Sequence, residues 1–165
     1  MAVVRAFVSR AGADKAFAVD FRERLKPHLD LRTGAIALWE FELDLYAGRS
    51  VDGQIQAELA QTAVGICLVS APWKASWYAI NRELKELVLA ERIIIPVLLR
   101  PIDLELHDLG ALNGQWIVTD QEDRSRKDGR SYIECSAENG ERDRFVIRVV
   151  REIVRRLEEP REGRA

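Results

Sequence analysis

A short stretch of the chain, Ser70 to Glu83, combines aromatic side chains with one carboxylate directly after an apolar run, Val64 to Val69. Its aromatic residues are Trp73, Trp77 and Tyr78. A strand that ends in a small polar residue and leads through aromatic residues to an acid on a helix builds a pocket with a flat wall and a single charge. Such a pocket is suited to chemistry on a nucleotide.

The helical position of Glu83 allows two interpretations. On a wheel of about 100° per residue, Glu83 lies at the border of the apolar stripe that contains Ile80, Leu84 and Leu87. A carboxylate at such a border is partly desolvated and still reachable, so it can act electrostatically on a ligand. The alternative is a glutamate on the helix surface that pairs weakly with Arg82 or Asn81 nearby. For the aromatic residues, the alternative to ligand stacking is packing in the core.

Strands and helices must position these residues, and the sequence predicts them as five apolar runs that alternate with helical patterns. The runs lack in–out alternation, which indicates strands buried on both faces, as in a parallel sheet covered by helices. This order predicts right-handed crossovers and a doubly wound α/β fold. The predicted strands are Val3–Val8, Ala35–Leu38, Val64–Val69, Ile93–Leu99 and Trp116–Val118.

Several local features refine this prediction. Asp14 is placed to cap the first helix. Pro96 removes a hydrogen bond of the strand ladder, so we expect a bulge or an early strand end there. A weak helical pattern covers Leu104–Leu112, and the clearest helix covers Phe145–Leu157. We expect one domain over residues 1–158, followed by a flexible C-terminal tail over residues 159–165.

The composition excludes several classes of function. The chain of 165 residues carries 25 basic and 27 acidic side chains, and this balance offers no electrostatic case for a nucleic acid or a membrane as partner. Its two cysteines, Cys67 and Cys135, make neither a disulfide framework nor a metal site. No signal peptide pattern is found, so a cytoplasmic protein is expected. The two histidines, His28 and His107, have no ligand spacing around them, so no bound metal is expected.

Two other segments are expected at the edge of the sheet where the strands end. Ser9 and Arg10 precede a helix N-terminus, where they suit phosphate or ribose contacts, or where they form an ordinary loop. The connection from Trp39 to Gly53 is the second segment, and Trp39 either closes the pocket or packs in the core. The chain has no Gly-x-Gly-x-x-Gly or Walker-type loop, which argues against dinucleotide dehydrogenases and P-loop enzymes.

Four segments, in this order, resemble a bacterial Toll/interleukin-1 receptor (TIR) domain, and the resemblance covers residues 3–157. They read AFVSRAGADKAFAVDFRERLKPHL, IALWEFELDLYAGRSVDGQIQAELAQTAVGICLVS, SWYAINRELKEL and IIIPVLLRPID. The resemblance implies a flavodoxin-like three-layer fold, with a five-stranded parallel sheet in the order 2-1-3-4-5 and helices on both faces.

The resemblance also implies an activity, because many bacterial members of the family hydrolyse or cyclise NAD+. Their catalytic glutamate lies early in the third helix, at the position of Glu83. We therefore expect an NAD+ glycohydrolase that uses NAD+ as substrate and needs no cofactor, with ADP-ribose or its cyclic isomer as product. The substrate-binding residues expected around Glu83 are Ser9, Arg10, Trp39, Asp44, Arg49, Trp77 and Tyr78.

The same resemblance implies that the domain is activated by self-association through the loop Phe41–Gly53 and adjacent surfaces. An unidentified protein or domain is expected to trigger this association. The implied role is anti-phage defence or nucleotide signalling. Two positions depart from the family pattern, since Ala47 replaces a proline and Ala79 replaces a tryptophan. These departures favour the alternative, a non-catalytic module that assembles with other TIR domains. A sensor that binds a nucleotide without cleaving it is a third class.

Overall fold

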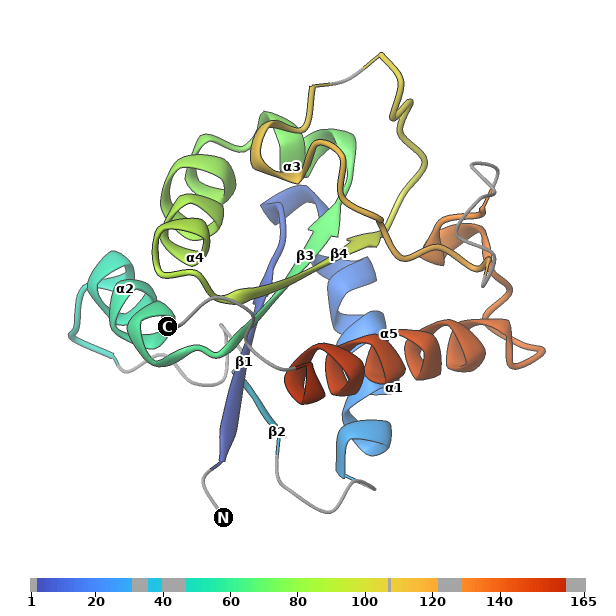
Figure 1. The fold of residues 1–165 in the computed structure, drawn as a ribbon, viewed down its shortest axis with the longest axis horizontal. Helices are drawn as coiled ribbons and strands as arrows, with labels where there is room; N and C mark the ends of the chain where they lie inside the picture. The colour runs from blue at the N-terminus through green and yellow to red at the C-terminus, as the bar shows by residue number, and fades with distance from the viewer. Residues whose placement is uncertain (1–2, 31–35, 40–46, 107, 122–128, 160–165) are drawn as a thin grey trace.

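Four parallel strands form one sheet in the order β2-β1-β3-β4 (Figure 1). The computed structural model describes residues 3–30, 36–39, 47–106, 108–121 and 129–159. The strands are β1 (Val4–Ser9), β2 (Ile36–Trp39), β3 (Val64–Val69) and β4 (Ile93–Leu98). The predicted doubly wound α/β fold with a parallel sheet is therefore confirmed.

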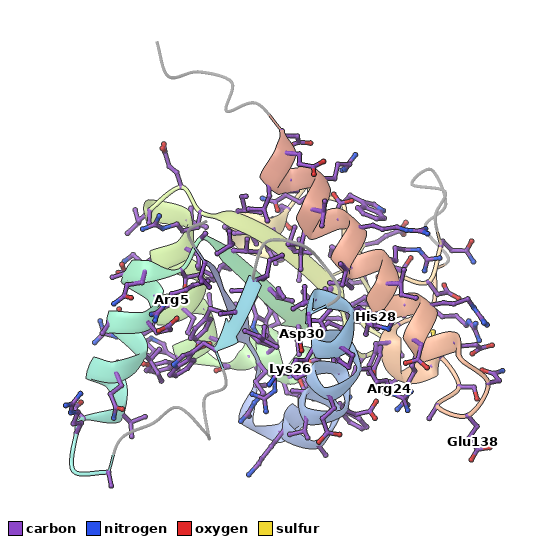
Figure 2. The ribbon with its side chains drawn as sticks, turned by 90° about the horizontal axis from the view of Figure 1, so that it is seen from below. Arg5, Arg24, Lys26, His28, Asp30 and Glu138 are labelled. Atoms are coloured by element: carbon purple, nitrogen blue, oxygen red, sulfur yellow. The ribbon has the colours of Figure 1, made fainter. Side chains whose placement is uncertain are left out.

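Helices cover both faces of the sheet, as expected. The helices α1 (Lys15–Asp30) and α5 (Glu141–Glu158) lie on one face, and α2 (Val51–Gln61) and α4 (Lys85–Leu89) lie on the other (Figures 1 and 2). A short helix α3 (Ala71–Ala75) and a π-helical segment (Ala79–Leu84) connect β3 to α4. Within the described ranges, no helix combines the length and the apolar character needed to cross a membrane.

Every residue of β3 is buried, which explains its continuous apolar sequence. Because side chains alternate along a strand, Ile66 and Leu68 join the core under α1 and α5, whereas Cys67 and Val69 join the core under α2 and α4. The stripe predicted for the last helix is confirmed by the burial of Phe145, Val146, Val149 and Ile153 on α5.

The predicted fifth strand is wrong as a strand, because Val118 forms only an isolated bridge with Val97 beside β4. The apolar run Trp116–Val118 is short, and its hydrogen bonds with β4 are the pair Val118 N to Pro96 O and Leu98 N to Val118 O, both at 2.9 Å. Pro96 supplies no donor here, so the described part of the ladder ends after one residue of this run.

The expected bulge or early end at Pro96 is also wrong, since β4 continues to Leu98 in unbroken register with β3. The N–H and C=O positions of one residue point to the same side of a strand. The Pro96 carbonyl accepts from Val118, on the side away from β3, so the missing N–H removes no bond between β3 and β4.

Two helix predictions also change. Asp14 lies in a 3-10 turn, Gly12–Asp14, and its buried carboxylate accepts hydrogen bonds from Ser70 and Arg100 rather than acting as the expected cap. The weak helix over Leu104–Leu112 is reduced, in the described part of this range, to a 3-10 turn at Gly110–Leu112. Leu109 and Leu112 are buried, but Leu104 and Leu106 are exposed, so the first part of this segment lacks the buried stripe that stabilises a helix.

We predict that Gly65→Ala destabilises the protein, because a Cβ atom at Gly65 would lie 2.4 Å from Cδ1 of the buried Leu87. Overpacking of this kind costs about 1–3 kcal/mol, measurable as a lower free energy of unfolding in urea. The matched control is Gly53→Ala on α2, where the new Cβ meets only Ser50 at 3.5 Å. The control is expected to be neutral or stabilising by up to about 1 kcal/mol. Equal stability of the two variants would contradict the prediction.

Candidate active site

A cavity of about 460 Å³ opens at the carboxyl end of β1, where this strand continues past its pairing with β2. Its lining comes from β1, the loop that follows β1, α1, α2 and the segment before α4. The charged and aromatic residues among the described lining are Phe7, Arg10, Arg22, Asp52, Tyr78 and Glu83. The cavity therefore lies where ligands bind in open α/β sheets.

Glu83 is 7% exposed and belongs to the lining of this cavity. Its Oε1 accepts a hydrogen bond of 2.8 Å from the hydroxyl of Ser9. The Ser9 oxygen accepts in turn from the indole N–H of Trp73 at 3.0 Å. Because the indole can only donate, the Ser9 proton is directed to the carboxylate, and the chain of bonds holds Glu83 in one orientation.

Burial raises the pKa of Glu83 to about 7, from an ordinary value of 4.5. The hydrogen bond from Ser9 and the charge of Arg10 oppose this shift, because both stabilise the ionised form. The carboxylate consequently changes its charge close to neutral pH, which is a property of groups in functional sites.

A π-helical turn, Ala79–Leu84, brings Glu83 into the cavity. The wider turn buries the two neighbouring residues Glu83 and Leu84 together. The regular wheel placed Glu83 only at the border of the stripe, because it assumes 3.6 residues per turn. Such π-bulges inside α-helices occur frequently at functional sites.

Tyr78 is, with Phe7, one of the aromatic residues that line the cavity. Its hydroxyl donates a hydrogen bond of 2.7 Å to Asp52 in the first turn of α2. Burial and the Asp52 carboxylate raise the pKa of Tyr78 to about 12, so the phenol keeps its proton at neutral pH. Asp52 also lies 3.8 Å from the guanidinium of Arg82. The hydrogen bond to Asp52 on α2 therefore fixes the position of the Tyr78 ring.

The other predicted site residues have different environments. Trp39 stacks on Phe7 with ring centroids 5.4 Å apart and packs against the core under α2, as in the alternative interpretation. Trp77 is 66% exposed and is not among the described residues that line the cavity, whereas Tyr78 is. Arg49 lies on the exposed turn before α2. Asp44 lies outside the described residues.

Arg22 and Asp52 line the cavity but were not predicted from the sequence. For Arg22 a signal existed, because it lies between Ala18 and Leu25 at the spacing of the buried stripe of α1. A charged residue at an inward position of an otherwise apolar stripe is unusual. Asp52 had no such signal, because an acidic residue in the first turn of a helix is common.

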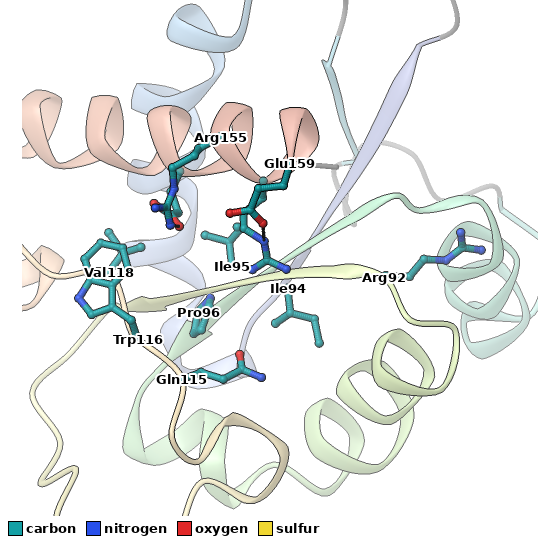
Figure 3. Close-up of a pocket in the computed structure, with 11 residues that line it drawn as sticks. Arg92, Ile94, Ile95, Pro96, Gln115, Trp116, Val118, Arg155 and Glu159 are labelled. Carbon is teal, nitrogen blue, oxygen red and sulfur yellow. Dashed lines mark hydrogen bonds and ion pairs between the residues drawn. The ribbon is translucent and has the colours of Figure 1, made fainter. Parts of the chain in front are cut away.

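A second cavity, of about 410 Å³, lies on the outer side of β4 (Figure 3). Its charged residues come mainly from α5 and pair locally, with Arg155 at 2.5 Å from Glu152 and Arg156 at 3.3 Å from Glu159. This cavity contains neither Glu83 nor an aromatic residue paired with a buried carboxylate among its described lining. We therefore regard the cavity at Glu83 as the candidate active site.

The parallel sheet, its two helical layers and the cavity at its carboxyl edge define a flavodoxin-like α/β domain with a candidate ligand site. The family model described as the TIR domain matches residues 6–132. The chain belongs to the TIR domain family, which confirms that its sequence resembles a TIR domain. The predicted domain boundary at residue 158 coincides with the end of α5 and stays a prediction.

Among solved structures, the fold is similar to the TIR domain of the Toll-related receptor TRR-2 from Hydra magnipapillata. The two share 16% sequence identity at a TM-score of 0.57, and the match covers 90% of this chain and 97% of the other. At this identity the similarity concerns the fold alone. No curated protein matches the chain.

We predict that Glu83 makes the protein less stable as the pH rises from about 4.5 to about 7. In this range the unfolded chain has lost the Glu83 proton and the folded protein still binds it, so the free energy of unfolding falls with pH. Glu83→Gln removes this dependence. Its stability relative to the unmodified protein should rise by about 2–3 kcal/mol between pH 5 and pH 8, as measured by urea denaturation. A difference that is constant with pH would show that the carboxyl group is not desolvated.

Proposed function

We propose that this TIR domain cleaves NAD+ at the bond between nicotinamide and ribose, with Glu83 as the catalytic residue. The observation that supports the proposal most strongly is the carboxylate of Glu83, which is buried, held by Ser9 and part of the lining of the cavity. Membership of a family with NAD-cleaving members supports the choice of substrate.

The chemistry of this reaction needs only one carboxylate. When the glycosidic bond breaks, its electron pair moves to the pyridinium nitrogen, so nicotinamide leaves as a neutral molecule without protonation by an acid. Positive charge then develops on the ribose ring. An ionised Glu83 stabilises this charge and hydrogen-bonds the ribose hydroxyls. Water adds to the ribose carbon and loses a proton to give ADP-ribose, or a nitrogen of the adenine ring adds instead and gives a cyclic isomer.

The supporting residues have separate tasks in this proposal. Ser9 and Trp73 fix the carboxylate, so little reorganisation is needed when charge develops on the sugar. Tyr78, fixed by Asp52, offers its ring face to the nicotinamide. The cationic pyridinium of the bound substrate favours the ionised carboxylate, which draws the pKa of Glu83 below about 7 in the complex.

The burial of Glu83 favours an enzyme over a module that only assembles. A desolvated carboxylate destabilises the folded protein, and a scaffold surface gains nothing from it. A nucleotide sensor could use the same cavity, but stacking and phosphate contacts suffice for binding, whereas a carboxylate beside the ribose stabilises the cleavage step.

We also propose that self-association activates the domain, in the cytoplasm, as part of anti-phage defence or nucleotide signalling. The described part of the loop Phe41–Gly53 supports a contact surface next to the cavity. Residues 47–50 are all exposed, and Val51, which follows them and lines the cavity, is 50% exposed. A partner bound there would alter the cavity directly.

Glu83→Ala is expected to reduce nicotinamide release from NAD+ by at least about 100-fold, because it removes the group that stabilises the developing charge. Release is measured by chromatography over a range of protein concentrations, and it should rise more steeply than in proportion to the protein. The matched control is Glu86→Ala, an exposed acid three positions further along the same segment. Equal release by Glu83→Ala and Glu86→Ala, or no release by the unmodified protein at any concentration, would favour the interaction module.

The pH dependence of kcat/KM tests the role of Ser9. In the unmodified protein, kcat/KM should rise tenfold per pH unit below about 7 and level off above it, as Glu83 ionises. Ser9→Ala removes a hydrogen bond that lowers the pKa of Glu83, so the midpoint should move to higher pH. If the variant loses activity with an unchanged midpoint, Ser9 does not act through the charge of Glu83.

A further inference from the structure

Arg22 is a buried cation in the wall of the candidate active site. It is 8% exposed, and it lies on the inward face of α1 beside the fully buried Phe21. It is also part of the cavity lining that contains Glu83. An arginine in such a position normally has an acceptor, because an unpaired buried charge is costly.

Among the described residues, no acceptor contacts Arg22, and its Nε is buried without a hydrogen bond. Other arginines of the fold have carboxylate partners. Arg24, two positions further along α1, pairs with Asp20 and with Asp143 at the start of α5, both at distances of 3.3–3.4 Å (Figure 2 shows Arg24 on α1). Arg100 lies 3.0 Å from the Asp14 carboxylate. The contrast indicates that the guanidinium of Arg22 is available for a group that enters the cavity.

We propose that Arg22 is the anchor of an anion subsite that takes the phosphate oxygens of a nucleotide diphosphate. A guanidinium presents N–H donors in a planar fork that matches two phosphate oxygens, and it remains charged when buried. A second cation, Arg10, belongs to the lining of the same cavity. That the nucleotide is NAD+ rests on the proposed function, whereas the affinity for a diphosphate rests on Arg22 itself.

The charges around the cavity divide in a way that fits such a ligand. Glu83 and Asp52 are acidic, and Arg10 and Arg22 are basic. A dinucleotide with a pyridinium ring and a diphosphate carries both signs of charge, so each part meets a group of opposite charge. A volume of about 460 Å³ lies within the range of small-molecule sites. The subsite therefore predicts a preference for phosphorylated substrates over nicotinamide riboside, which has the same scissile bond and no phosphate.

The test is thermal denaturation with inorganic pyrophosphate at constant ionic strength set by sodium chloride, and with ADP-ribose. Both ligands should raise Tm by at least about 2 °C at saturation, because they bind only the folded protein. The rise should be lost in Arg22→Met. The matched control, Arg24→Met on the same helix, removes a paired arginine outside the described lining and should keep the rise.

The free variants give a second readout. Arg22→Met should melt at the same temperature as the unmodified protein or higher, because it removes an unpaired buried charge, whereas Arg24→Met should melt lower. A structural arginine would show the opposite order. If Arg22→Met does not fold, Arg22→Lys is used, and it should fold and keep a reduced rise. Failure of both variants to fold, or a rise that persists in Arg22→Met, overturns the proposal.

The outcomes separate this subsite from the proposed hydrolysis. Glu83→Gln should lose turnover and keep the rise in Tm with pyrophosphate. A rise that depends on Arg22 in a protein that releases no nicotinamide would leave the subsite standing and remove the hydrolase. The opposite result is that Arg22→Met hydrolyses NAD+ with an unchanged KM and that pyrophosphate does not raise the Tm of the unmodified protein. This result would remove the subsite and leave the hydrolase standing.

Discussion

The arrangement of the site depends on the buried carboxylate of Asp14. It follows β1, and it accepts from Ser70 at the end of β3 and from Arg100 after β4, so one group ties together the carboxyl ends of three strands. Ser70 also accepts from the backbone N–H of Trp73 at 3.1 Å, which starts α3 and fixes the position of the indole. The indole then orients Ser9, and Ser9 orients Glu83. The position of the Glu83 carboxylate therefore depends on these loop contacts, which are buried except for the part-buried bond from Arg100.

Two charged groups in the cavity work against the stability of the fold. Glu83 is desolvated, and Arg22 is buried without an acceptor among the described residues. Each is unfavourable in the empty site and becomes favourable when a ligand of opposite charge is present. Burial of these charges lowers the stability of the free domain. The same charges strengthen ligand binding and, in the proposed reaction, stabilise the positive charge that develops on the ribose. The rest of the core, which is apolar on both faces of the sheet, tolerates this loss.

Much of the fold was predictable because burial on both faces leaves continuous apolar runs, and the predicted run Val64–Val69 is β3 residue for residue. The run Trp116–Val118 looked similar, but the sequence does not show to which side of β4 the missing donor of Pro96 points, and in the fold it points to this run. Glu83 was found through its aromatic neighbours and the family resemblance. The deep burial of Glu83 was not predicted, because the π-helical turn that causes it depends on tertiary packing rather than on a period in the sequence. Arg22 was not predicted, although it interrupts the buried apolar stripe of α1.

The position of Pro96 has a consequence for how sheets of different molecules meet. A strand at the edge of a sheet offers a row of donors and acceptors on which a foreign strand can grow. On the outer side of β4, that row lacks the donor of residue 96, and the carbonyl of the same residue is already occupied by Val118. A second molecule that aligned its own strand there would find the ladder interrupted at its centre. The sheet can therefore terminate at β4 without a full fifth strand, and this edge is a poor template for a strand of another molecule.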